Sequence, residues 1–173
     1  EAEIELTLEQ LLAGGKTEFS LRDAQGKTRT LSVGIPPGTT QGTRIRLGGQ
    51  GSPGAGGGPA GDLLLRIRVA EHPRFALEGT DLRETLDVTP WEAALGAKVE
   101  VKTLDGAVDL KIPPGTPSER VFRLRGLGLR RTADQRGDLL VKLRIVVPPE
   151  PTDDERRLFE ELAEKSSFRP RGS

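Results

Sequence analysis

Ile35-Pro36-Pro37-Gly38-Thr39 returns 77 residues later as Ile112-Pro113-Pro114-Gly115-Thr116, and this repeat decides how the rest of the chain is interpreted. The match extends to Gly61-Asp62-Leu63-Leu64 and its copy Gly137-Asp138-Leu139-Leu140. A repeat has to be recognised before elements are assigned, because it defines the folding unit. Two copies with so long a period predict tandem small domains rather than a solenoid.

The composition is consistent with two small cores and with no metal or cofactor. The 173 residues are 34% apolar, and 22 glycines with 13 prolines leave little room for helix. A net charge of zero provides no global field for nucleic acid, and no apolar run approaches the ~20 residues of a membrane span. The lack of cysteine excludes disulfides and thiolate metal sites. We expect a cytoplasmic protein and, because the chain begins at Glu1 without Met, a fragment of a longer one.

Both copies show the period-2 alternation of half-buried strands, and each contains one short helix. The predicted helices span residues 8–13 and 90–95. The predicted strands span residues 4–8, 16–22, 28–33, 43–47, 62–69, 82–88, 97–102, 107–112, 120–125 and 139–147. Residues 48–61 hold eight glycines and predict a loop.

A third helix is predicted near the C-terminus. Thr152 and Glu155 form the capping-box pattern that begins a helix. Leu158, Phe159 and Leu162 then lie on one apolar stripe of that helix.

The sequence offers little material for catalysis. His72 is the only histidine and lies in a linker, where a solvated or hydrogen-bonded role is favoured over a catalytic one. Residues 49–54 match a dinucleotide-binding fingerprint, but Pro53 and further glycines prevent the helix that this motif requires. The arginines of a basic cluster could contact phosphates, yet they lack interleaved aromatic residues and predict a solvated loop. These are Arg125, Arg130, Arg131 and Arg136. We therefore expect neither an enzyme nor a nucleic-acid binder.

Peptide binding at a sheet edge is the chemistry that remains. An edge strand has unpaired N–H and C=O groups to which an extended peptide can add. The best candidate is residues 16–22, where Phe19 and Leu21 share a face. Leu63 and Leu65 have matching parity on the last strand of the copy, and with Phe75 they complete a predicted apolar groove. The alternative is that these side chains form the core of a thin domain. Phe19 aligns with Val101, so the second copy offers less apolar surface.

Several phrases together resemble the C-terminal substrate-binding region of DnaJ-family co-chaperones. They are Gly61-Asp62-Leu63, His72-Pro73-Arg74-Phe75, Glu92-Ala93-Ala94-Leu95-Gly96 and Gly126-x-Gly128. The resemblance covers nearly the whole chain. No Cys-x-x-Cys-x-Gly-x-Gly repeat occurs, so the chain resembles the zinc-free class.

The resemblance implies a mainly β fold with two tandem β-sandwich-like domains, each with a short helix, and a C-terminal dimerisation helix. The expected boundaries are residues 1–76 for the peptide-binding domain, 77–150 for the second domain and 151–173 for the helix and tail. Phe19, Leu21, Leu63, Leu65 and Phe75 match groove-lining sites of the family. Leu158, Phe159 and Leu162 match its dimer contact.

The implied function is that of a stress-response chaperone module, a homodimer that captures unfolded client proteins. Delivery to a DnaK-type chaperone would depend on a J-domain outside this sequence. The alternative from another class is a non-binding structural scaffold that oligomerises through its helix.

Overall fold

The computed structural model describes residues 1–23, 25–52, 54, 56 and 58–172. Ala24, between the predicted strands 16–22 and 28–33, lies outside this range, as do three residues of the predicted loop 48–61 and Ser173. The fold is mainly β, as predicted, with several small sheets and three helices.

The first unit, residues 2–69, combines a three-stranded sheet with a separate hairpin. The sheet order is β1-β5-β4, in which β5 pairs parallel with β1 and antiparallel with β4. The hairpin joins β2 and β3. The elements of this unit are β1 (Ala2–Leu6), α1 (Leu8–Ala13), β2 (Gly15–Arg22), β3 (Thr28–Ile35), β4 (Arg44–Leu47) and β5 (Leu63–Val69).

The second unit, residues 76–145, repeats this plan and adds one strand. Its sheet order is β10-β11-β7-β6, and its hairpin joins β8 and β9. The elements are β6 (Ala76–Glu78), β7 (Asp81–Val88), α2 (Pro90–Leu95), β8 (Ala97–Thr103), β9 (Gly106–Ile112), β10 (Val121–Leu124) and β11 (Leu139–Ile145). The sequence analysis did not predict β6, because three residues are too few to show a period. It also extended β11 to residue 147, whereas the strand ends at Ile145, shortly before Pro148, which has no N–H to donate to a ladder.

All three helices begin with the same local device. Thr7, Thr89 and Thr152 are the N-caps, and each accepts a hydrogen bond from the backbone N–H three residues on. The side chain of that third residue bonds back to the cap in every case. The predicted capping box at Thr152 is thus confirmed, and its pattern recurs at both short helices.

The hairpin and the sheet of each unit enclose a common interior. Ile35 of the hairpin and Ile67 of the sheet belong to one buried cluster. Val101, Leu110 and Ile112 of the second hairpin join that cluster as well. The buried core therefore runs through both units without interruption.

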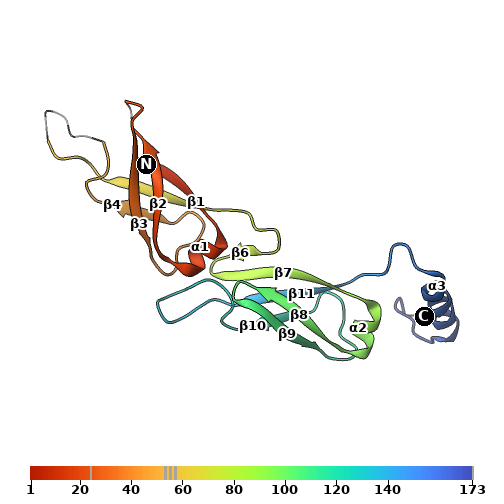
Figure 1. Ribbon diagram of the computed structural model, residues 1–173. Coiled ribbons are helices and arrows are strands. Elements are labelled where there is room, and N and C mark those ends of the chain that lie inside the picture. Colours follow the sequence, from red (N-terminus) through yellow and green to blue (C-terminus); the bar gives the residue numbers. More distant parts are fainter. Residues whose placement is uncertain (24, 53, 55, 57, 173) are drawn as a thin grey trace.

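Figure 1 shows the two units in succession, with α3 (Asp153–Lys165) beyond an extended segment. No residue of α3 is buried. Among the described residues, no helix has the length and apolar character needed to cross a membrane.

Candidate functional site

The strand β2 offers a sheet edge for pairing. In the part of the chain that the structure describes, β2 has one strand neighbour, β3, with Phe19 opposite Leu31 and Leu21 opposite Arg29. The second edge of β2 therefore leaves backbone N–H and C=O groups available to an added strand.

The two apolar faces predicted for the groove each contribute one residue to the buried core. Phe19 shares its face of the hairpin with Ile35, and Leu65 shares its face of the sheet with Ile67. Ile35 and Ile67 lie in one buried cluster, whereas Phe19 and Leu65 do not belong to it.

The structure places the five predicted groove residues at two depths. Phe19 and Leu21 are half-buried, so part of each side chain is accessible from outside. Leu63, Leu65 and Phe75 are only 5%, 0% and 4% exposed. These three side chains pack as core residues, so the surface that a bound peptide could reach is the half-buried rim formed by Phe19 and Leu21.

The side chains at the equivalent positions of the second unit are buried. Val101 and Thr103, which correspond to Phe19 and Leu21 in the repeat, are only 1% and 7% exposed. The hairpin of the second unit therefore covers its interior where that of the first unit leaves apolar surface at the rim.

Arg29 is a residue of this rim that the sequence analysis missed. It lies opposite Leu21 on the inner face of the hairpin, and its Nη2 donates to the carbonyl of Gln50. Its Nε is buried and has no acceptor among the described residues. The parity that Arg29 shares with Leu31 and Val33 is a sequence signal that places it on the inner face.

The linker histidine is hydrogen-bonded, which was one of its two predicted roles. Nδ1 of His72 accepts from the N–H groups of Arg74 and Phe75, at 3.1 and 3.3 Å. Nε2 must then carry the hydrogen, and it lies 3.0 Å from Oε1 of Glu9 on α1. The pKa of Glu9 is lowered by its own backbone N–H and further by His72. His72 thus ties the linker to the first unit.

Phe75 lies at the junction of the two units. The His72 ring and the guanidinium carbon of Arg74 are both 4.9 Å from the centroid of its ring. Phe75 also lines two cavities, of about 620 and 390 Å³. The larger cavity also contacts Glu84, whose pKa is raised by burial.

The predicted dimer contact lies beside an exposed tryptophan. Leu158 and Leu162 are each 61% exposed on α3, and Trp91 of α2 is 44% exposed. The rings of Trp91 and Phe159 are 6.4 Å apart, and these four residues with Glu155 line an apolar cavity of about 350 Å³. Trp91 was not predicted here, because only the packing of α2 near α3 places it on this surface.

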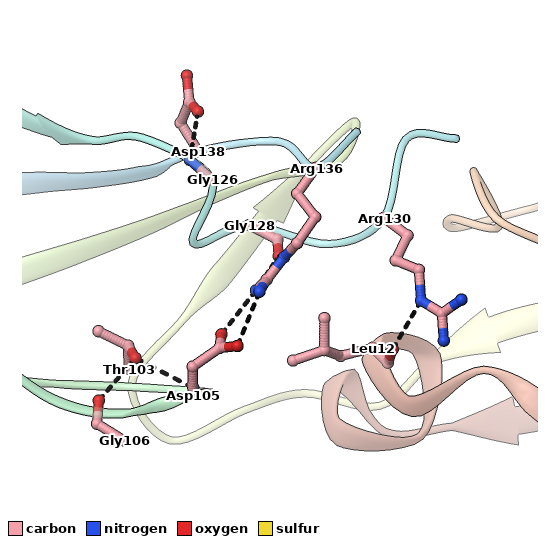
Figure 2. A network of polar contacts seen from close by, with 9 residues as sticks. All are labelled: Leu12, Thr103, Asp105, Gly106, Gly126, Gly128, Arg130, Arg136 and Asp138. Atoms are coloured by element: carbon pink, nitrogen blue, oxygen red, sulfur yellow. Dashed lines mark hydrogen bonds and ion pairs between the residues drawn. The ribbon is translucent and has the colours of Figure 1, made fainter. Parts of the chain in front are cut away.

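The predicted solvated loop of arginines is only partly solvated. Figure 2 shows Arg136 paired with both carboxylate oxygens of Asp105, at 2.7 and 2.6 Å, and Arg130 donating to the carbonyl of Leu12. Arg125 and Arg131 are exposed. The prediction was wrong for Arg130 and Arg136, because groups distant in sequence provide their partners.

Comparisons with known proteins bear on the whole chain. The profile of the family described as "DnaJ C terminal domain" matches residues 1–148. A protein named "Curved DNA-binding protein" from Pseudomonas putida is 46% identical over 180 residues, covering 99% of this chain and 56% of that protein. The protein of the same name from Coxiella burnetii is 46% identical over 154 residues, covering 89% of this chain and 49% of the relative. The chain thus spans about half the length of the curated relatives it matches.

Proposed function

Since this chain belongs to the family of DnaJ C-terminal domains, we propose that it is the client-binding module of a co-chaperone. The rim of the first unit would capture unfolded polypeptide. A client segment would add to the second edge of β2 through backbone hydrogen bonds, which do not depend on client sequence. Its apolar side chains would contact Phe19 and Leu21, and Leu63, Leu65 and Phe75 would be the buried residues of the site.

One observation carries this proposal, namely the difference between the two copies at equivalent positions. Phe19 and Leu21 keep accessible surface, whereas Val101 and Thr103 are buried. A position needed only for the core gains nothing from partial exposure, because stabilisation by apolar burial grows with the area removed from water. The exposed part of the rim is therefore better explained by binding.

The remaining roles extend this proposal to the parent protein. Residues 1–76 and 77–150 would be the two domains, and α3 with its tail would join two copies through Leu158, Phe159 and Leu162. A J-domain in the rest of the protein would bring the client to a DnaK-type chaperone in the cytoplasm. The module itself would have no catalytic activity.

Replacing Phe19 by alanine tests the proposed rim. Phe19→Ala should weaken capture of an unfolded client in a light-scattering aggregation assay and leave the thermal midpoint nearly unchanged, because the side chain is only half-buried. A fall in stability of ~3–5 kcal/mol, the usual cost of truncating a buried phenylalanine, would instead assign Phe19 to the core.

Two further substitutions are matched controls. Val101→Ala truncates the equivalent position of the second unit and should lower stability without weakening capture by the folded protein. Ser20→Ala alters the exposed outer face of β2 and should change neither property. Equal loss of capture in all three variants would contradict a site at the rim.

Two rival functions remain to be separated from this one. A structural scaffold would oligomerise but bind no unfolded client. DNA binding is suggested by the name of the relatives. The zero net charge of this chain and the contacts of Arg130 and Arg136 within the protein favour client binding instead. Retention of duplex DNA that decreases steeply with salt would support the DNA-binding alternative.

A further inference from the structure

The repeated Pro-Pro-Gly-Thr phrase is bonded to its helix in the second unit. Gly115 donates its N–H to the carbonyl of Ala94, and Thr116 donates to that of Ala93, both at 3.1 Å. The last carbonyls of a helix have no partner within the helix. The second unit thus satisfies the end of α2 with its own loop.

In the first unit the equivalent groups do not meet. Gly38 donates instead to the backbone carbonyl of Arg130, at 2.9 Å. The carbonyls of Leu12 and Ala13 accept from Nε and Nη2 of Arg130, at 3.0 and 2.6 Å. Arg130 belongs to the second unit, and Figure 2 shows its side chain extending to Leu12 on α1. Arg130 therefore lies between the N–H of Gly38 and the carbonyl of Leu12. In the second unit the equivalent groups, on Gly115 and Ala94, bond to each other directly.

The glycines that end α1 and α2 show the same difference between the two units. A Cβ added at Gly14 would lie 2.7 Å from Nη2 of Arg130, whereas one added at Gly96 would meet the ring of Pro114 at 3.0 Å. Pro114 belongs to the repeated phrase of its own unit. The guanidinium of Arg130 therefore takes, in the first unit, the place that the phrase takes in the second.

Arg130 is well suited to this position, and hydrogen bonds of neighbouring residues hold its loop in place. A cation is favoured at the negative end of a helix, and a guanidinium can donate to two carbonyls at once. Next to it, Leu129 donates its N–H to the carbonyl of Thr80, at 2.8 Å. The pairing of Arg136 with Asp105 fixes the same loop to the hairpin of the second unit. Movement of Arg130 thus requires movement of this loop or of the unit.

We propose that Arg130 is a wedge that fixes the angle between the two units. Without it, the first unit would close as the second does, with Gly38 donating to Leu12. The two units would then remain joined by the shared buried core, by the linker and by contacts such as that from Oγ1 of Thr40 to the carbonyl of Gly79, at 2.8 Å. Without the polar bridge between α1 and the second unit, the angle would vary. The wedge would act on this angle whether or not the first unit binds clients.

The angle can be measured directly, because the chain has no cysteine to interfere with spin labels. Ser32→Cys and Lys102→Cys place labels on exposed positions of the two hairpins. The labelled chain is diluted with unlabelled chain, so that only distances within one chain are recorded by pulsed EPR. The distance distribution should have one narrow peak, and Arg130→Ala should broaden it at least twofold.

Arg125→Ala is the matched control, since it removes the same charge from an exposed position of the second unit. It should leave the distribution narrow. An unchanged distribution in Arg130→Ala, or equal broadening in Arg125→Ala, would overturn the proposal. Failure of Arg130→Ala to fold, judged by circular dichroism, would do so too, because the first unit could then not close without the arginine.

The amide of Gly38 provides a second readout at the wedge itself. Through-hydrogen-bond NMR couplings should join the Gly38 nitrogen to the carbonyl carbon of residue 130 in the unaltered protein. In Arg130→Ala the coupling should move to the carbonyl carbon of Leu12. A coupling that stays with residue 130 in the variant would show that the backbone contact, and not the guanidinium, holds the two units.

Discussion

Asp62 and Asp138 have the same role in the two units. Each carboxylate accepts a backbone hydrogen bond from the loop that precedes the last strand of its unit. Asp62 accepts from the N–H of Gly49 at 3.0 Å, and Asp138 accepts from that of Gly126 at 2.9 Å. Arg123 also donates to Asp138, at 2.6 Å. The backbone N–H of Gly126 and then Arg123 lower the pKa of Asp138. Its charged form is therefore stabilised by folding.

This shift predicts how stability depends on pH. The pKa of Asp138 is lower in the folded state than the ~3.9 of an unperturbed aspartate. Its contribution is present above that value and is lost as the pH falls through the folded pKa. In urea unfolding, Asp138→Asn should thus lose less stability than the unaltered protein between about pH 5 and pH 2.

The control for this prediction is Asp134→Asn, an exposed change in the same loop. It should keep the pH dependence of the unaltered protein. Parallel curves for Asp138→Asn and the unaltered protein would mean that the carboxylate does not gain its stabilisation on folding.

The helix α3 has strong local helix-forming signals, but none of its residues is buried by the rest of the chain. Its capping box and three acidic residues in the first turn favour the helix. Yet an isolated helix of 13 residues is only marginally stable in water, and none of its residues is buried. Its apolar stripe, next to Trp91, must be covered if α3 is to remain folded, and a second copy is the proposed cover.

Charged residues on this stripe should separate the two copies. Leu158→Glu with Leu162→Glu would place two carboxylates in the proposed dimer contact, where burying an unpaired charge is costly. Sedimentation equilibrium should then give the mass of one chain, with lower helix content by circular dichroism. Glu164→Ala, at an exposed position outside the lining of the cavity, should leave the mass unchanged. An unchanged mass in the double variant would reject α3 as the contact.

In the whole molecule, the proposed dimer would contain two rims, one in the first unit of each chain. Binding of one client segment raises the effective concentration of the next, so two weak sites act together when the client can reach both. The wedge at Arg130 would set the distance to be spanned. Affinity would therefore depend on client length as well as on client sequence.

The monomeric variant tests this dependence. Leu158→Glu with Leu162→Glu should bind a short peptide, which fills one rim, as well as the unaltered protein does. A long unfolded client should be held at least tenfold more weakly, because joint binding is lost. Fluorescence anisotropy with both ligands measures the two affinities. Equal losses for both would point to damage at the rim, and no loss for the long client would rule out joint binding.

Features that depend on neighbours along the chain could be predicted from the amino-acid sequence alone. The repeat gave the plan of two similar units, period-2 patterns located most strands to within about two residues, and a capping box located α3. The pattern of a threonine followed by Gln10 or Glu92 three residues later was also present at the two short helices. These signals are local because hydrogen bonds over three or four residues decide them.

The depth of each predicted site residue and the partners of the polar side chains follow from three-dimensional packing. Parity put Phe19 and Leu65 on inner faces but could not tell a half-buried rim from a core position that is 0% exposed. Arg130 reaches carbonyls 117 and 118 residues away. Such contacts arise from the packing of one unit against the other. No pattern along the chain encodes them, because residues that are remote in sequence become neighbours only when the core closes.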